Sequence, residues 1–374
     1  MLAQVKKMPT RRLNLTSAAI LMGFFLCGHD AHATTGSVTQ WGTGQSGFPG
    51  GLNSVTAVTT AMDHSVVLNA NGTVTCWGYN FDGQTAVPGG LNNVIAVSSG
   101  DFFSVALRSD GSIIGWGSND YGQCSPPPIS GVTQISAGHG HCLARKSDGT
   151  VVAWGSDAFG QTEVPPGLSG VSAVLAAWNY SLALKSDGTV VAWGLNDVGQ
   201  TSVPGGLNGV VALAGNQTYC LALKNNGTIV AWGVYPALPG GLNNVVGIAA
   251  GLTHALAVKS DGSVVAWGLN FTGETTVPES LSGAAAVAAG WNYSLALAGN
   301  STLAVLLTNP RWSGNVFTVS LQSQNGKSYA LEYKNAVTDS GWTGLVPVGG
   351  NGGAMTLSDT SANVPKRVYR VRAQ

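Results

Sequence analysis

Short apolar runs separated by turn-forming residues recur along most of the chain. One stretch, residues 171–207, reads VSAVLAAWNYSLALKSDGTVVAWGLNDVGQTSVPGGL and holds four such runs, at residues 171–175, 181–184, 189–193 and 201–203. Each run has the length of a strand and is too short for a helix. The pattern therefore predicts a unit of four short antiparallel strands.

The unit repeats, and the dipeptide Trp-Gly marks each copy. Its tryptophans, spaced 35 to 39 residues apart, are Trp41, Trp77, Trp116, Trp154, Trp193, Trp232 and Trp267. Four strands in about 40 residues are typical of one blade of a β-propeller. Because Trp-Gly belongs to the constant part of the unit, we expect these tryptophans to pack in the core.

A second constant feature lies between the second and third runs of the unit. There the chain carries Asn71-Gly72, Asp110-Gly111, Asp148-Gly149, Asp187-Gly188, Asn226-Gly227 and Asp261-Gly262. Asn-Gly and Asp-Gly between two apolar runs are a strong hairpin signal, because a primed turn needs positive φ. The hairpins are thus predicted independently of the tryptophans.

The two ends of the repeat region complete one another. Trp41-Gly42 has no apolar runs before it, whereas the last apolar set, residues 285–307, has no Trp-Gly after it. We expect the N-terminal strand to join the C-terminal set and close the ring. The predicted fold is an all-β, seven-bladed β-propeller over residues 34–307, closed by the N-terminal strand.

A different pattern follows residue 307. Residues 316–321, 328–333 and 367–372 alternate apolar with polar side chains, which indicates half-buried strands. Asn325-Gly326 predicts a hairpin between the first two, and Trp342 lies between the second and third. Residues 308–374 are therefore predicted to form a small C-terminal β-sandwich domain.

The composition agrees with many tight turns and few helices. Glycine accounts for 53 of the 374 residues and charged residues for only 9%. Residues 1–33 have a basic start, an apolar stretch over 18–26 and Ala31-His32-Ala33, which together indicate a secretory signal cleaved after Ala33. We therefore expect a secreted or cell-surface protein, with no membrane span in the mature chain.

Charge and motifs exclude several functions. Without the leader the chain has 13 basic and 16 acidic residues, and no basic stripe indicates a nucleic-acid partner. No P-loop, G-x-S-x-G, H-E-x-x-H or paired-cysteine metal motif is present, so we predict neither an enzyme nor a cofactor. His139-Gly140-His141 resembles a metal pair, but sister units place Tyr at the position of His141, which indicates a structural role. We expect a monomer.

Four cysteines remain after the leader, at Cys76, Cys124, Cys142 and Cys220. Each replaces a small residue of the sister units. Cys142 and Cys220 hold equivalent positions two units apart, which is too far for a disulfide. Free thiols in small core positions are the prediction.

The unit A-V-x-A-G-x-x-H-S-L-A-L-K-S-D-G-T-V-V-A-W-G-x-N-x-x-G-Q resembles the repeat of the regulator of chromosome condensation family, over residues 38–307. Repeat length and the Gly-Gln-Thr-x-Val-Pro segment are similar to those of its secreted bacterial β-lactamase inhibitory members. The resemblance implies a seven-bladed propeller that binds another macromolecule. For those bacterial members the implied partner is a class A β-lactamase, but likeness of fold does not fix a target.

Variation among the units locates the expected contact surface. The second loop and the Pro-Gly-Gly-Leu connection barely change, whereas the first and third loops vary and, by alternation of antiparallel strands, share one face. In the fifth unit Val234-Tyr235-Pro236 replaces the longer third loop, which predicts a local notch. The residues expected to bind a partner are Phe81, Asp101, Phe102, Asp120, Tyr121, Phe159, Trp178, Asn179, Tyr235, Phe271, Trp291 and Asn292.

Aromatic rings among short polar groups are typical of interface hot spots. The sequence thus favours an exported scaffold that binds a protein partner through this face. A carbohydrate or cell-wall binding propeller is the alternative, and a polymer-cleaving hydrolase or lyase comes third. Packing of individual rings between blades also stays open.

Overall fold

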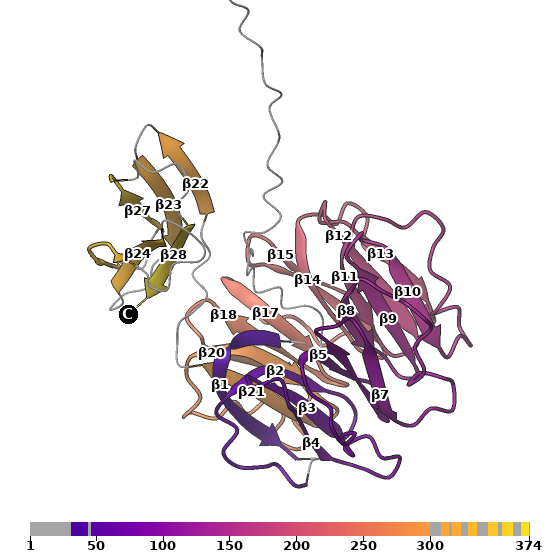
Figure 1. Cartoon of the computed structure of the whole chain (residues 1–374). Coiled ribbons are helices and arrows are strands. Elements are labelled where there is room, and N and C mark those ends of the chain that lie inside the picture. Colours follow the sequence, from indigo (N-terminus) through magenta and orange to yellow (C-terminus); the bar gives the residue numbers. More distant parts are fainter. Residues whose placement is uncertain are drawn as a thin grey trace, which may run out of the picture.

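The computed structural model describes residues 31–43, 46–299, 308–313, 316–322, 328–334, 343–350, 354–361 and 368–373 (Figure 1). Within these ranges the chain forms strands and no helix, as predicted, and hence no helix that could span a membrane. The predicted leader lies outside the described residues except for its last three positions.

The repeat region contains the strands β1 (Ala31–Gly42), β2 (Val55–Thr60), β3 (His64–Asn69), β4 (Val74–Gly78), β5 (Val94–Ser99), β6 (Phe103–Arg108), β7 (Ile113–Gly117), β8 (Val132–Ala137), β9 (His141–Lys146), β10 (Val151–Gly155), β11 (Val171–Ala176), β12 (Tyr180–Lys185), β13 (Val190–Gly194), β14 (Val210–Gly215), β15 (Tyr219–Lys224), β16 (Ile229–Gly233), β17 (Val245–Ala250), β18 (His254–Lys259), β19 (Val264–Gly268), β20 (Ala284–Ala289) and β21 (Tyr293–Gly299).

Consecutive strands pair in threes. Among the described residues, β5–β6–β7, β8–β9–β10, β11–β12–β13, β14–β15–β16 and β17–β18–β19 are three-stranded antiparallel sheets, and β20-β21-β1-β2-β3-β4 is a six-stranded one. We call the strands of each set first, second and third in this order, with β1 as the third strand after β20 and β21. The first loop joins the first and second strands, the second loop joins the second and third, and the third loop follows the third strand.

The fourth apolar run of each unit is not a strand, so the prediction of four strands was wrong. After β13, Ser202 N donates to Gly199 O and Val203 N to Thr201 O, both at 3.0 Å. Thr201 N donates to Asn196 Oδ1 at 3.0 Å. Because these backbone groups are satisfied within the loop, no ladder forms there. The apolar Val203 packs instead on the edge of a core cluster.

The second loops are hairpins, as predicted, but of another turn type. Gly111 has a φ of 84° and its N–H donates to Arg108 O at 2.9 Å, whereas Asn93 and Asn244 are the only described non-glycine residues with positive φ. A primed turn would require positive φ at Asp110 as well. The loop is instead a type I turn that ends in a left-handed glycine. Asp110 Oδ1 accepts the backbone N–H of the second residue after it at 2.9 Å.

The predicted closure by the N-terminal strand is confirmed. β1 pairs with β21 in continuous antiparallel register, from Gly36 opposite Gly299 to Gly42 opposite Tyr293. A Cβ at Gly36 would lie 2.4 Å from the backbone oxygen of Ala298, so only glycine permits this approach. The ring is therefore closed by segments from opposite ends of the repeat region (Figure 1).

The core lies between neighbouring sheets. One cluster joins Leu175 and Leu182 of one sheet with Leu213 and Trp232 of the next. The predicted core role of the Trp-Gly tryptophans is confirmed, because all seven are only 4% to 8% exposed.

The tryptophans also explain the constant Gly-Gln of the third loop. The indole N–H of Trp193 donates to Gln161 O at 2.9 Å, across to the preceding unit. Trp154 and Trp232 make the same bond to Gln123 O and Gln200 O. Each glutamine carbonyl thus anchors the next sheet.

The four cysteines Cys76, Cys124, Cys142 and Cys220 are free thiols, as predicted. Cys142 and Cys220 are buried, and the other two are partly exposed. Burial raises the pKa of Cys76 to about 12 and that of Cys124 to about 11, which keeps both thiols protonated at neutral pH.

The tail forms two further sheets. They consist of β22 (Thr308–Ser313), β23 (Val316–Gln322) and β27 (Ala354–Asp359) in one, and β24 (Ser328–Lys334), β25 (Thr343–Gly344), β26 (Val348–Gly349) and β28 (Val368–Ala373) in the other. Residues from β23, β24 and β27 share one apolar cluster.

The hairpin predicted between β23 and β24 was wrong. β23 pairs with β22 and β27, whereas β24 pairs with β25, β26 and β28. The two strands therefore lie in different sheets. Both alternate apolar with polar residues, and their apolar faces meet in the shared cluster. Asn325-Gly326 and Trp342 lie outside the described residues.

Candidate binding face and axial pocket

The first and third loops of each unit lie at the same end of the ring, as predicted. Tyr79 N, just after β4, donates to Asp63 O of the first loop at 2.7 Å. The same bond joins Ser118 to Phe102, Ser156 to Gly140, Leu195 to Asn179, Val234 to Thr218 and Leu269 to Thr253. At the other end, Val94 N at the start of β5 donates to Gly72 O of the second loop. We call the end that carries the first and third loops the loop face.

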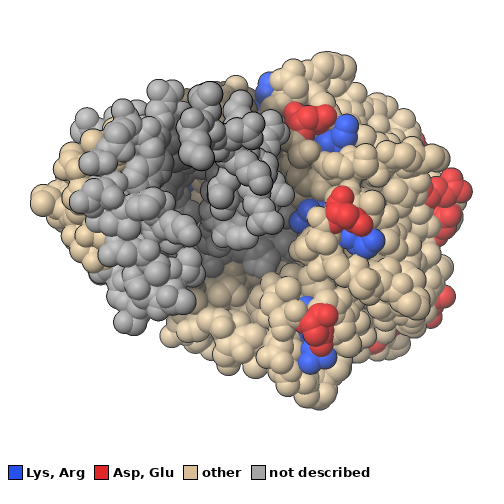
Figure 2. All heavy atoms as spheres, turned by 45° about the horizontal axis from the view of Figure 1, so that its top comes forward, with Lys and Arg blue, Asp and Glu red and all other residues tan. Residues whose placement is uncertain are grey.

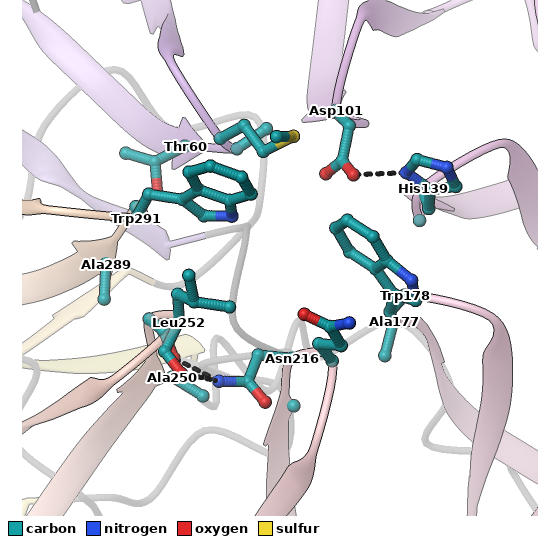
Figure 3. A pocket seen from close by; sticks show the side chains of 17 residues that line it. Thr60, Asp101, His139, Ala177, Trp178, Asn216, Ala250, Leu252, Ala289 and Trp291 are labelled. Atoms are coloured by element: carbon teal, nitrogen blue, oxygen red, sulfur yellow. Dashed lines mark hydrogen bonds and ion pairs between the residues drawn. The ribbon is translucent and has the colours of Figure 1, made fainter. Parts of the chain in front are cut away.

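First loops from all the sheets surround a pocket at the centre of the loop face (Figure 3). Its cavity volume of about 50 Å³ is well below that of ordinary small-ligand pockets, about 300–1,000 Å³, so the space suits one side-chain group rather than a whole small molecule. The lining residues are Thr60, Ala61, Met62, Asp101, Gly138, His139, Ala177, Trp178, Gly215, Asn216, Gln217, Ala250, Gly251, Leu252, Ala289, Gly290 and Trp291. We call it the axial pocket.

Two indoles and one carboxylate dominate the axial pocket. Trp178 and Trp291 lie on opposite sides of the opening, and the carboxylate of Asp101 lies between them at the rim of the same space (Figure 3). Asp101 Oδ2 bonds to His139 Nδ1. The ring of His139 stacks on Trp178 with centroids 4.2 Å apart and planes 22° apart. The rings of Phe102 and His139 meet edge to face, with centroids 6.4 Å apart.

The carboxylates near the axis are poorly solvated. The side chain of Asp101 is 12% exposed. Burial raises its pKa, and the hydrogen bond and charge of His139 offset only part of that rise. Burial also raises the pKa of Asp63, and repulsion by the charge of Asp101 adds to it. A positive group placed in the pocket would favour the ionised form of both acids.

A second group of aromatic residues lies on the third loops, outside the pocket. Phe81 is 85% exposed and Phe271 is 81% exposed, and Tyr121, Phe159 and Tyr235 are also exposed. Within one loop, Tyr79 stacks on Phe81 with ring centroids 6.3 Å apart. These rings do not fill gaps between sheets.

The structure therefore divides the predicted contact residues between two places. Asp101, Trp178 and Trp291 line the axial pocket. The others lie on the loop face outside the pocket, namely Phe81, Phe102, Asp120, Tyr121, Phe159, Asn179, Tyr235, Phe271 and Asn292. Whether they bind a partner stays a prediction.

The prediction omitted pocket residues that are not aromatic. These are Met62, His139, Asn216, Gln217 and Leu252. Met62, His139, Gln217 and Leu252 occupy the first-loop position that Trp178 and Trp291 hold in their own units, and Asn216 comes one residue earlier. Alignment of the repeats could have identified them, because equivalent loops of a closed ring surround its axis.

Below the pocket, the first residue of each second strand ties neighbouring sheets together. Tyr219 donates its hydroxyl to His254 O at 2.7 Å, and His141 Nε2 lies 3.0 Å from Ser181 Oγ. The position is held by His64, Phe103, His141, Tyr180, Tyr219, His254 and Tyr293. Burial lowers the pKa of His141 to about 3 and that of His254 to about 4. The structural interpretation of His141 is confirmed.

The shortened third loop after β16 changes the next sheet. Gly268 is exposed, whereas the glycines of the other Trp-Gly pairs are partly covered. Trp267 is 7% exposed, and its Nε1 has no hydrogen-bond partner within the described residues. The missing Gly-Gln segment is the one that supplies the acceptor carbonyl in other units. The deletion thus removes one hydrogen bond between sheets. It also removes atoms that would cover Gly268.

Comparison with protein families gives one match. The model of the regulator of chromosome condensation (RCC1) repeat matches residues 63–84, 94–123, 132–161, 176–200 and 245–274. Its five matches each contain one Trp-Gly pair, and the pairs at Trp41 and Trp232 lie outside them. No curated protein sequence matches the chain.

Solved structures show the same fold at low sequence identity. Prp20p from Saccharomyces cerevisiae, described together with its binding to Gsp1p and histones, has 19% identity and a TM-score of 0.61, over 74% of this chain and 94% of its own. Yeast RCC1 (Prp20) bound to Kap60 has 19% identity and a TM-score of 0.60, over 80% and 97%. Human WBSCR16 has 18% identity and a TM-score of 0.55, over 70% and 98%.

Proposed function

We propose that this chain, which is built from regulator of chromosome condensation repeats and has their propeller fold, binds a protein partner through its loop face. Propellers of these repeats are mainly binding or regulatory proteins. Prp20p is described with its binding to Gsp1p and histones, and yeast RCC1 is bound to Kap60. These likenesses support a binding scaffold and leave the partner of this chain to its own loops.

The observation that carries the proposal is the exposure of large aromatic side chains at one end of the propeller. Phe81 and Phe271 are more than four-fifths exposed, and Tyr121, Phe159 and Tyr235 lie on the same loop face. Large exposed apolar patches are typical of surfaces that bind a partner. Rigid aromatic rings supply contact area at low conformational entropy cost, which suits protein recognition.

The test is capture of a partner from culture supernatant and cell-surface fractions by the immobilised protein. The double variant Phe81→Ala plus Phe271→Ala should lose at least tenfold in partner affinity, which is about 1.4 kcal/mol for two exposed anchors. Ile95→Ala plus Val246→Ala is the matched control, because these exposed side chains follow the starts of first strands, towards the other end of the ring. Equal capture by both double variants would contradict the proposal, as would binding of glycans without any protein.

We also propose that the chain is exported. The support is the basic start, apolar stretch and Ala31-His32-Ala33 of the N-terminal segment. Mass spectrometry of the protein recovered from the medium or cell surface should give Thr34 as the first residue. Recovery of a chain that retains Met1 from the cell interior alone would oppose export.

A further inference from the structure

Positive charge is confined to one end of the ring. In residues 35–299 the basic residues are Arg108, Arg145, Lys146, Lys185, Lys224 and Lys259. All lie in the last two positions of second strands, next to the second loops and away from the loop face. Arg108, Lys146 and Lys185 form ion pairs with aspartates of those loops, at 3.1 to 3.3 Å. Figure 2 shows basic residues (blue) next to acidic residues (red). It also shows acidic residues at the edge of the view with no basic residue beside them.

The loop face carries acidic side chains and neither Lys nor Arg. Its aspartates are Asp63 and Asp101 on first loops and Asp82, Asp120, Asp157 and Asp197 on third loops. Some of them bond to neutral groups, as when Thr162 N donates to Asp157 Oδ1 at 2.8 Å. Among the described residues, the ion pair of Asp101 with His139 is the one that involves these six. The two ends of the ring therefore differ in sign, and the loop face attracts cations.

The axial pocket has the chemistry of a cation site. A cation within about 6 Å of an indole face is attracted by the ring quadrupole, and the attraction is stronger when the site is desolvated. Trp178 and Trp291 present such rings on two sides, and Asp101 adds a poorly solvated carboxylate between them (Figure 3). His139 occupies Asp101 Oδ2, and no hydrogen bond to Oδ1 is found within the described residues. One carboxylate oxygen is thus left for a ligand.

We propose that the loop face docks a basic segment of a protein partner and that the axial pocket receives one of its arginine or lysine side chains. The inference rests on the proposed function and deepens it by naming the chemistry of the partner. The cationic group lies against the faces of the Trp178 and Trp291 rings, and Asp101 accepts hydrogen bonds from its N–H groups. The surrounding aspartates attract the remaining positive charges, and the exposed rings of the third loops cover apolar parts of the segment.

The probe is a fluorescein-labelled Gly/Ser peptide that carries several arginines, compared with the same peptide carrying citrulline, which keeps the shape without the charge. We expect saturable binding of the arginine peptide to the full chain by fluorescence anisotropy. The citrulline peptide and a glutamate version should bind at least tenfold more weakly. Binding should weaken as salt rises, because exposed charges are screened. Equal binding of the arginine and citrulline peptides, or no saturation up to millimolar arginine peptide, overturns the inference.

Variants locate the site. Asp101→Asn should weaken binding of the arginine peptide about tenfold, as expected for loss of a charge-assisted hydrogen bond. Asp148→Asn is the matched control, since Asp148 lies in a second loop at the other end of the ring, and it should bind normally. Trp291→Ala, with thermal unfolding as a check of the fold, should also weaken the peptide at least fivefold. Equal effects of Asp101→Asn and Asp148→Asn would sink the inference.

The capture experiment separates this inference from the proposed function. A protein partner that depends on Phe81 and Phe271 but is insensitive to Asp101→Asn and to salt would leave the loop face as the binding surface and refute a basic partner. Loss of capture on Asp101→Asn with normal folding supports both.

Discussion

The residue at the start of each second strand is chosen by its neighbour across the sheet boundary. Histidine is found where the next sheet offers a serine hydroxyl, as in His64 with Ser104, His141 with Ser181 and His254 with Ser294. Phe103 shares a cluster with Cys142, and Tyr180 lies 3.1 Å from the sulfur of Cys220. Cys142 and Cys220 thus stand in the place of that serine, beside the rings of Phe103 and Tyr180.

His141 should make the fold sensitive to acid. Its pKa is about 3 in the folded protein, against 6.5 as the ordinary value, so the unfolded chain binds a proton first as pH falls. Stability is therefore complete above about pH 6.5 and is lost as pH falls towards 3, by at most about 1.4 kcal/mol per pH unit for this group. In urea unfolding at pH 7, 6, 5 and 4, His141→Phe should show a shallower loss than the parent.

The change fits the site, because Phe103 holds the equivalent position beside Gly100 as His141 does beside Gly138. Tyr180→Phe is the control, since it alters the equivalent buried residue of the next unit without removing a histidine. Parallel pH curves for His141→Phe and the parent would refute the assignment.

The tryptophans of two sister units, Trp193 and Trp267, offer a matched test of the indole bond. Trp193→Phe loses the bond to Gln161 O and should destabilise the protein by about 1 kcal/mol beyond the lost packing. Trp267→Phe removes an indole N–H that has no partner within the described residues, so it should cost only the packing. Urea unfolding of both variants measures the difference. Equal losses would mean that Trp267 has an acceptor, such as a bound water.

At the scale of elements, pairing between distant segments decides where each strand lies. β1 comes from the N-terminal side of the repeats and completes the set of β20 and β21. Its alternation is preserved there, with Val38 buried in a cluster with Leu295 and Leu297 and Ser37 exposed. The strand is therefore held by its apolar face as well as by its ladder.

Val38→Asp should weaken this closure. An unpaired carboxylate in the apolar cluster costs about 3 kcal/mol or more, which is a large part of the stability of an ordinary domain. Ser37→Asp, one position along the same strand, should change stability by less than about 0.5 kcal/mol. The measurement is the urea midpoint of each variant. Similar midpoints would show that β1 contributes little to the closed ring.

For the whole molecule, the ring separates a constant end from a variable one. The second loops repeat the same turn and lie next to the basic residues, whereas the loop face collects aromatic and acidic side chains. Closure makes the variable loops surround one axis, so side chains far apart in sequence share a pocket. This is the physical basis of the proposed binding face.

The tail should be dispensable for the ring. No ladder joins β1 to β21 with β22 to β28 within the described residues. A chain that ends at residue 307 should therefore keep its β-sheet circular dichroism and unfold in one transition, within a few degrees of the full chain. Loss of that transition would show that the ring depends on the tail, against the proposed boundary at residue 307.

The sequence by itself determined the all-β class, the repeat, the hairpins, the core tryptophans and the closure, because each follows from local patterns that every unit repeats. It could not show that the fourth run becomes a turn, since Val203 is apolar in either case and only the local bonds of Ser202 and Thr201 decide. The pairing of the tail strands could not be predicted for a related reason, because alternation indicates a strand but not its neighbour.

The axial pocket was decided by tertiary structure alone. Asp101, His139, Trp178 and Trp291 come from separate units, and their meeting depends on the curvature and closure of the ring rather than on any local pattern. The missing acceptor of Trp267 likewise depends on which loop lies beside it. Repetition specifies the scaffold because each unit solves the same packing problem, whereas the site is made by the differences among units once the ring brings them together.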